Sequence, residues 1–367
     1  MPAKIAASVT QKLSLRTALL LCFTVLLVGG CSRSSSSALS EYQARIARLT
    51  DSETVPVQRP NFERLPRVQE SRSEIPEYTI SLVASQRLNR CRAGQLIADR
   101  NSSLGRVQPP HLRLRHEIEM LIALPECLAD ADVASQSIAA ELATAITHKQ
   151  ETLPLWTQRL LTTEPILRDA LRPGRKVLGP EEMAGAQETL AALDNILYVL
   201  AAIDEYLDEP SQTDVLDDLN LAEYWQPSWQ ALGQSDFLPR YWRSQQHALG
   251  AMRALNLQLA GAEQALRCSA TRTPVEAEYL HTVMLNFWIA ELQPMFAHWN
   301  SLQQQLTVRL QQLQSFYESS AWLDYFEHLI GEQSYAAQLQ REVRIHAEHW
   351  QSLLASCQLD PVSGRRN

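Results

Sequence analysis

The clearest helical pattern in the chain lies in residues 180–207, PEEMAGAQETLAALDNILYVLAAIDEYL. Its leucines recur at intervals of three, four, three and seven residues, at Leu190, Leu193, Leu197, Leu200 and Leu207. Two isoleucines, Ile196 and Ile203, lie beside this stripe. Apolar residues at spacings of three and four share one face of an α-helix, so the segment predicts a helix that buries this face in a bundle.

The same period continues through most of the chain after residue 77. Helices are expected at about 78–100, 110–124, 130–162, 164–171, 236–268, 275–314, 319–330 and 334–357, with breaks at proline and glycine. No segment alternates apolar and polar residues with a period of two over the length of a strand. The sequence therefore predicts an all-α protein of long antiparallel helices in a bundle-like body.

The N-terminus has the pattern of a bacterial secretion signal that ends at Cys31. The pattern consists of three cations, an apolar run and two glycines: Lys4, Lys12, Arg16, residues 18–28, Gly29 and Gly30. It resembles the lipobox of bacterial lipoproteins, in which the cysteine is lipidated and the chain is cut before it. The run of about eleven apolar residues is shorter than the roughly 18 that a membrane span needs. We therefore expect removal of residues 1–30 and acylation of Cys31, for instance with palmitate.

The processed chain is acidic. Removal of residues 1–30 takes away three cations and no acid, and so changes the net charge from −8 to −11. An acidic chain without a clustered basic stripe lacks the surface of a nucleic-acid-binding protein, which excludes that class. Acyl chains alone suffice to hold a protein on a bilayer, because each buried methylene contributes about 0.8 kcal/mol. The body is therefore expected to be a soluble globule that reaches the membrane through its N-terminal lipid.

Composition divides the chain into five segments. We expect a signal peptide at residues 1–30, a lipidated cysteine and serine-rich tether at 31–38, a short helix and proline-rich strap at 39–76, a helical domain at 77–358 and a polar tail at 359–367. The strap contains four prolines: Pro56, Pro60, Pro66 and Pro76. Prolines among alternating charges favour an extended segment that either lies over the body or acts as a linker.

Four cysteines remain once Cys22 leaves with the signal and Cys31 is lipidated: Cys91, Cys127, Cys268 and Cys357. Cysteines of exported proteins usually pair, and four of them allow three connectivities. We predict that the first two pair, because both lie in one N-terminal helical region. The last two are predicted to pair because each ends a long predicted helix. The first pairing requires a helix break near residues 88–94.

All eight tryptophans lie from Trp156 onward, among predicted helices, where they are expected to fill the core. The segment 223–240 differs, because it combines two tryptophans with two prolines and a glycine. We expect it to be irregular, and an exposed aromatic loop there could contact a glycan or a protein partner.

The densest polar cluster is Asp99-Arg100-Asn101-Ser102-Ser103, at the end of the first predicted helix of the domain. One interpretation is structural, since such residues close a helix C-terminus and hydrogen-bond the following turn. The other is a binding site, with Arg100 as an anion clamp and Ser102 or Ser103 as polar contacts. A serine nucleophile is poorly supported, because the strand–turn–helix setting of a G-x-S-x-G motif is missing.

Glu117 and Glu291 each interrupt an apolar helical stripe. A carboxylate that loses water must be ion-paired or protonated. Each glutamate therefore predicts either a buried salt bridge or a general acid with a raised pKa.

His346 and His349 lie one helical turn apart, but neither an H-E-x-x-H motif nor a third ligand accompanies them. His346 falls on an apolar stripe with Trp350, so we expect a hydrogen-bonded core histidine and no metal. The processed chain has no glycine-rich phosphate loop, and no cofactor is predicted.

Several blocks together resemble an uncharacterised family of Gram-negative, proteobacterial lipoproteins. They are the lipobox, the tether and strap, the stretch from Cys91 to Cys127 with its Arg100-Asn101-Ser102-Ser103-Leu104-Gly105 core, and Glu291-Leu292-Gln293-Pro294. Asp99 stands where the family pattern has the longer glutamate. The family carries no established activity, so the resemblance implies a lipoprotein, a domain of unknown function and no catalytic residue.

We expect a non-enzymatic, lipid-anchored binding or scaffolding protein that faces the periplasm and has an envelope protein or glycan as its partner. The alternative is an envelope enzyme acting on peptidoglycan or lipid, with Glu291 or Glu117 as the acid and Arg100 orienting an anionic substrate. The two hypotheses differ in whether these side chains converge on one pocket. Ser32 follows the lipidated cysteine, where an aspartate would retain many lipoproteins at the inner membrane, so by that resemblance we expect the outer membrane.

Overall fold

The computed structural model describes residues 34–70, 74–130, 136–210, 214–269 and 272–364. Within these ranges all regular secondary structure is helical apart from one isolated bridge between Ser269 and Arg272, which confirms the predicted all-α fold. No helix in these ranges is long and apolar enough to cross a membrane. The predicted signal peptide and Cys31 lie outside the described residues.

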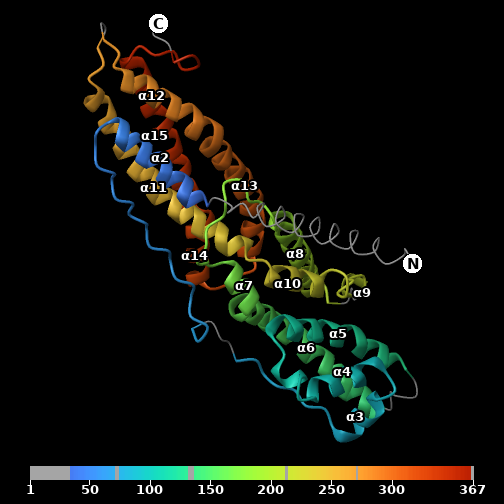
Figure 1. Ribbon diagram of the computed structural model, residues 1–367. Helices are drawn as coiled ribbons and strands as arrows, with labels where there is room; N and C mark the ends of the chain where they lie inside the picture. The colour runs from blue at the N-terminus through green and yellow to red at the C-terminus, as the bar shows by residue number, and fades with distance from the viewer. Residues whose placement is uncertain (1–33, 71–73, 131–135, 211–213, 270–271, 365–367) are drawn as a thin grey trace, which may run out of the picture.

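The helices form an elongated molecule with a long bundle at one end and a smaller helical unit at the other (Figure 1). The bundle consists of α2 (Ser35–Leu49), α11 (Phe237–Leu266), α12 (Val275–Val283), the π-helical segment η2 (Met284–Leu292), α13 (Gln293–Ser315), α14 (Ser320–Ile330) and α15 (Tyr335–Ser356). The smaller unit consists of α3 (Leu82–Leu88), α4 (Arg92–Asn101), the short helix η1 (Gly105–Val107), α5 (Pro110–Ala129) and α6 (Gln136–Thr163). Between them lie α7 (Pro165–Ala170), α8 (Ala186–Asp208), α9 (Asp214–Asp217) and α10 (Trp225–Gln234).

One large apolar core runs through the bundle and into the smaller unit. Its central helix is α11, which packs against α2 and α15. The predicted stripe of α8 is buried except for its last member, Leu207, which is half-buried. Six of its side chains are each at most 2% exposed: Leu190, Leu193, Ile196, Leu197, Leu200 and Ile203. The seven tryptophans from Trp225 onward are buried, as predicted, and Trp156 is half-buried. A second, smaller core lies among α3, α4, α5 and α6.

Most predicted helices are present, with ends shifted by a few residues. The break that the first cysteine pairing requires is found, because α3 ends at Leu88 and α4 begins at Arg92. The long helix predicted at 275–314 is continuous, but the π-helical segment η2 interrupts its α-helical geometry.

The expectation of an irregular aromatic segment at 223–240 is wrong. Helix α10 covers most of it, and Trp225 and Trp229 are fully buried. Pro227 lies in the first turn, where the backbone N–H has no acceptor within the helix, so it does not break the helix. The indole N–H of Trp225 donates to the His111 carbonyl at 2.9 Å, which ties α10 to the start of α5.

Helix α2 begins inside the segment that was expected to be a flexible tether, so the predicted boundary at residue 38 is wrong. The Ser34 hydroxyl accepts a hydrogen bond from the Ser37 N–H at 3.1 Å and caps the helix. Ser35 and Ala38 are buried. Serine is a strong N-cap, so one member of a serine run starts a helix where composition alone indicated a tether. The Ser35 N–H then donates to the Leu178 carbonyl at 2.9 Å.

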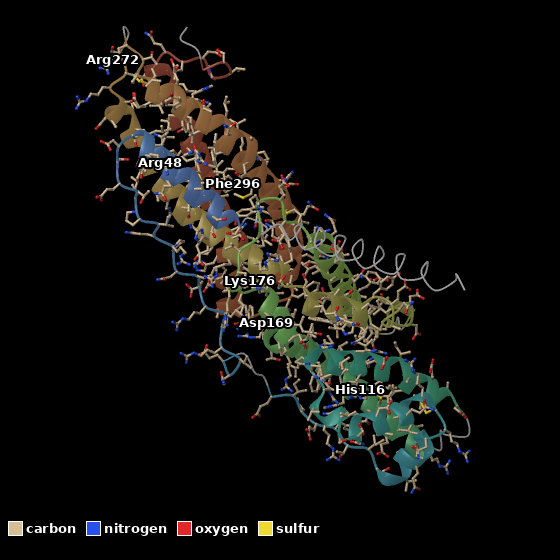
Figure 2. The ribbon with its side chains drawn as sticks, in the orientation of Figure 1. Arg48, His116, Asp169, Lys176, Arg272 and Phe296 are labelled. Carbon is tan, nitrogen blue, oxygen red and sulfur yellow. A yellow bond between two sulfur atoms is a disulfide. The ribbon has the colours of Figure 1, made fainter. Side chains whose placement is uncertain are left out.

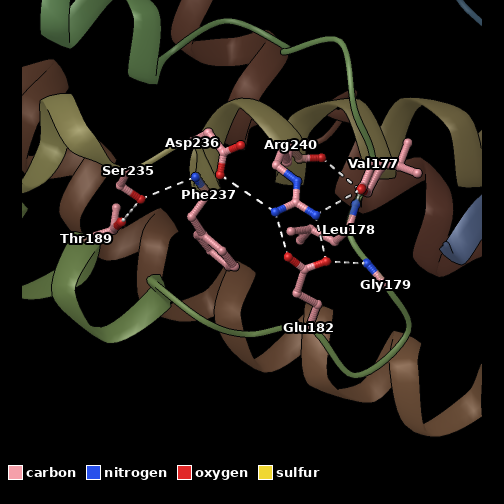
Figure 3. A network of polar contacts seen from close by, with 10 residues as sticks. Val177, Leu178, Gly179, Glu182, Thr189, Ser235, Asp236, Phe237 and Arg240 are labelled. Carbon is pink, nitrogen blue, oxygen red and sulfur yellow. Dashed lines mark hydrogen bonds and ion pairs between the residues drawn. The ribbon is translucent and has the colours of Figure 1, made fainter. Parts of the chain in front are cut away.

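The loop that receives α2 is held by an ion-pair network around Arg240, at the start of α11 (Figure 3). Arg240 pairs with Glu182 at 2.6 Å and donates to the Val177 carbonyl at 3.2 Å. The hydrogen bond from Arg240 lowers the pKa of Glu182, although burial opposes the shift. The Leu178 N–H donates to Ser244 Oγ at 2.8 Å. The start of α2 is therefore fixed to α11 through this loop.

Residues 51–66 form an extended strap along the outside of the bundle (Figure 1). The Val55 N–H donates to Gln258 Oε1 at 2.9 Å, and the Gln246 amide donates to the Pro60 carbonyl at 2.6 Å. Both glutamines belong to α11, so the strap follows this helix toward the smaller unit.

Two disulfides join Cys91 to Cys127 and Cys268 to Cys357, which confirms the predicted pairing. The first links the start of α4 to the end of α5 beside the smaller core. The second links the ends of α11 and α15. The sequence separations that they close are 36 and 89 residues.

Reduction of both disulfides is expected to lower the free energy of unfolding without removing the helices. In the chain-entropy model the shorter loop contributes about 4 kcal/mol and the longer about 4 to 5 kcal/mol, by restricting the unfolded chain. Guanidinium unfolding followed by circular dichroism, with and without a thiol reductant, measures the difference. Mass spectrometry of a non-reduced digest checks the connectivity, and four free thiols or a crossed pair would contradict it.

Candidate anion-binding site

Two cavities of about 430 and 400 Å³ lie in the smaller helical unit. Arg100 and Arg113 line both, so the two cavities adjoin. Together they form what we call the basic cavity, after the cations that line it: Arg100, Arg106, Arg113, Lys149 and Arg159. Among the described residues, no aspartate or glutamate lines either part. This concentration of positive charge contrasts with the net charge of −8 of the whole sequence.

Glu117 lies beneath the basic cavity, fully buried on α5. Arg113, one turn earlier on the same helix, pairs with it at 2.6 Å, and Lys149 of α6 pairs with its other carboxylate oxygen. A carboxylate that has lost its water needs such partners, because an uncompensated buried charge is very costly. Of the two roles predicted for Glu117, the structure gives it that of a buried salt bridge.

Several guanidinium donors of the basic cavity have no acceptor among the described residues. Nε and Nη1 of Arg113 and Nε of Arg100 are buried without a hydrogen-bond partner. Arg100 is held by its Nη1, which donates to the Gly105 carbonyl at 2.8 Å. The guanidinium groups of Arg113 and Arg159 lie 4.5 and 4.9 Å from the centre of the Trp156 ring. Buried guanidinium donors that are fixed in place suit the oxygens of a phosphate or carboxylate group.

His116 lines the larger part of the basic cavity, and the positive charges there affect its pKa. Figure 2 labels it within the smaller unit. Burial lowers the pKa of His116 to about 3, and the charges of Lys149 and Arg100 act in the same direction. The imidazole is therefore neutral near pH 7, and it adds a polar group but no charge to the wall.

The turn after α4 is built by its own hydrogen bonds. Ser102 Oγ donates to the Asp99 carbonyl at 2.7 Å and accepts from the Gly105 N–H at 3.0 Å. Position 105 requires glycine, because a Cβ there would lie 2.1 Å from the Asp99 carbonyl oxygen. The cluster predicted from sequence thus divides into two groups: Arg100 and Asn101 line the basic cavity, whereas Asp99, Ser102 and Ser103 are exposed and line neither part of it.

Glu291 lies in a different part of the molecule, in the π-helical segment of the bundle, and is half-buried. A π-helix bonds residue i to i+5, so its wider turn places residues four apart on the core face. The buried residues of this segment are Met284, Trp288 and Leu292. The predicted stripe through Glu291 assumed α-helical geometry and is wrong. The structure does not bring Glu291 together with Arg100 or Glu117, so Glu291 lacks the convergence on one pocket that would favour the enzyme hypothesis.

His346 is fully buried, and both ring nitrogens are hydrogen-bonded, which confirms the predicted core histidine. Its Nε2 lies 2.9 Å from the Tyr42 hydroxyl, and its Nδ1 lies 2.9 Å from Asn256 Oδ1. In the described part of the chain no three histidine, cysteine or acidic side chains are grouped so that they could hold a metal ion.

A family model described as "Protein of unknown function (DUF3080)" matches residues 39–361. The chain belongs to the DUF3080 family. The matched range starts within α2 and ends beyond α15, so the family domain includes both disulfides and the basic cavity. This agrees with the domain of unknown function that the sequence resemblance implied. No curated protein and no solved structure matches this DUF3080 chain.

Arg100, Asn101 and Glu117 of this DUF3080 site were predicted from the sequence, whereas most of its other side chains were not. Arg113 carried a readable signal, because it precedes Glu117 by four residues and such pairs face each other on a helix. Lys149 and Arg159 lie on α6 and carry no local signal of their role. Their position depends on how α6 packs against α5.

Glu117→Ala is expected to destabilise the fold by about 3 to 5 kcal/mol, because it leaves Arg113 and Lys149 without their shared counter-ion. Glu41→Ala is the matched control, since Glu41 and Arg45 also form a 2.6 Å pair one helical turn apart, but their side chains are 42% and 44% exposed. The control is expected to cost at most about 1 kcal/mol. Urea unfolding at neutral pH measures both, and equal losses would contradict the assigned role of Glu117.

Proposed function

We propose that this DUF3080 protein is a lipid-anchored cell-envelope protein that binds the phosphate group of an anionic ligand in the basic cavity. The observation that carries the proposal is the set of buried guanidinium donors without acceptors on Arg100 and Arg113. A guanidinium group can bind two phosphate oxygens at once through parallel hydrogen bonds. Cations in a concave site that is partly shielded from water also attract an anion more strongly than the same cations in open solvent.

The proposed role is binding rather than catalysis. The buried acid Glu117 is committed to ion pairs with two cations that line the basic cavity, Arg113 and Lys149. General acid–base catalysis requires a carboxyl group that can exchange a proton with the ligand. A partner protein or glycan of the envelope would bind this site through an anionic group.

The proposed location of the protein is the periplasmic face of the outer membrane. It is supported by the lipobox that ends at Cys31 and by Ser32 behind it. Two disulfides also favour an oxidising compartment. In the sequence only Ser32 and Arg33 separate Cys31 from Ser34, which caps α2, so the anchor would hold the bundle close to the bilayer.

Cys31→Ser is expected to release the protein from the membrane fraction, because it removes the thiol that would be acylated. Density-gradient fractionation of cells measures this, with Cys22→Ser as the control, since Cys22 would leave with the signal peptide. The wild-type protein and the control should sediment with outer-membrane markers. Sedimentation of Cys31→Ser with membranes would refute the anchor, and sedimentation of the wild type with inner-membrane markers would refute the outer-membrane address.

Arg100→Gln is expected to weaken the binding of inorganic pyrophosphate by about tenfold, a loss of about 1.4 kcal/mol. Isothermal titration calorimetry of the chain that begins at Ser32, which keeps every described residue, measures the affinity. Arg309→Gln is the control, because Arg309 of the bundle helix α13 pairs with Asp194 of α8 and lines neither part of the basic cavity. Absence of saturable binding, or equal losses in both variants, would overturn the proposal.

A further inference from the structure

The rim of the basic cavity exposes two large apolar side chains. Leu104 is 79% exposed and Val107 is 75% exposed, and only Val362 is more exposed among the large apolar residues of the described chain. Both flank residues that line the cavity, Gly105 and Arg106. Transfer of aliphatic side chains out of water lowers the free energy, so two highly exposed ones three residues apart mark a surface that can be covered.

These two side chains are held on a rigid support. Leu104 precedes the short helix η1 and Val107 is its last residue. The hydrogen bonds that Ser102 makes to Asp99 and Gly105, together with the bond from Arg100 to the Gly105 carbonyl, fix the turn. The apolar pair and the cationic wall therefore keep a constant relative position.

Charge decides what kind of surface fits this rim. Arg106 lies between the two apolar residues in the sequence, is exposed, and lines the smaller part of the basic cavity. Arg100 lines both parts. The acid of the same turn, Asp99, lines neither. Aliphatic side chains beside arginines suit the interface of an anionic bilayer, where phosphates lie just above the acyl chains.

We propose that this rim docks on an anionic phospholipid surface, with Leu104 and Val107 entering the headgroup layer and a lipid phosphate entering the basic cavity. The inference rests on the proposed function of the cavity and adds the source of the phosphate. The rest of the acidic chain would be repelled by such a surface, so contact is confined to the rim.

Vesicle sedimentation of the unlipidated chain that begins at Ser32 tests the proposal. Vesicles of phosphatidylcholine alone are compared with vesicles of phosphatidylcholine and phosphatidylglycerol in equal amounts. The wild-type chain should bind the mixed vesicles and not the neutral ones. The double variant Leu104→Ser, Val107→Ser should weaken binding to mixed vesicles by about tenfold or more, because it removes both side chains that enter the bilayer. The control variant Leu257→Ser, Val308→Ser changes two exposed residues of α11 and α13 and should bind as the wild type does.

Pyrophosphate titration separates this inference from the proposed function. The Leu104→Ser, Val107→Ser variant should bind pyrophosphate as the wild type does, whereas Arg100→Gln should lose affinity for both pyrophosphate and mixed vesicles. Pyrophosphate binding without vesicle binding would show that the cavity takes a free anion, which overturns the bilayer proposal and leaves the proposed function standing. Vesicle binding that survives either the rim variant or Arg100→Gln would also overturn it. If the wild type binds neither pyrophosphate nor mixed vesicles, both proposals are refuted.

Discussion

Burial of His346 is the constraint on which the bundle depends. The Asn256 amide donates to Glu342, so its oxygen accepts and His346 Nδ1 must carry the proton. Nε2 is then the acceptor, and it receives the Tyr42 hydroxyl. The Tyr42 oxygen in turn accepts the indole N–H of Trp350 at 2.7 Å. Burial lowers the pKa of the imidazole to about 3, so the ring is neutral near pH 7. This one side chain thereby fixes α2, α11 and α15 together, and only one tautomer satisfies every partner.

The two ends of the molecule handle buried polar groups differently. The side chains that hydrogen-bond to His346, namely Tyr42, Asn256 and Trp350, are neutral, and each of them has a partner. The basic cavity is charged and only partly compensated, since Glu117 is shared by Arg113 and Lys149 while other donors of Arg113 have no acceptor. Such a site is tolerated only where the surrounding backbone cannot collapse away from it. The smaller core and the disulfide between Cys91 and Cys127 supply that rigidity, because they hold α4 against α5.

The parts of the fold that could be predicted are those that local spacing determines. The leucines of α8 face the core because a period of 3.6 puts them on one side, and no knowledge of the rest of the chain is needed. Departures from ideal local geometry could not be predicted. Pro227 did not end a helix, because it fell in the first turn, and Glu291 left the apolar stripe because η2 changes the residues that share a face. The basic cavity was found only in part. Arg100 carried a turn signal, but Lys149 acts through contact between two helices, which is a tertiary property.

Folded elements connect the start of α2, which lies next to the proposed anchor in the sequence, to the basic cavity. The start of α2 is bonded to Leu178, and the residues around Leu178 are bonded to α11. The strap follows α11 and ends at α7, where Arg168 donates to the carbonyls of Pro66 and Thr162 and so joins the strap to the end of α6. In the proposed anchored state, the direction in which the cavity faces is therefore set by packing and hydrogen bonds rather than by a long linker. A flexible tether lets a binding site sample many orientations, whereas a rigid connection restricts it to few and removes most of the orientational entropy that binding would otherwise cost. This arrangement favours binding by an acidic protein, because the rim of the basic cavity is the part that an anionic surface attracts.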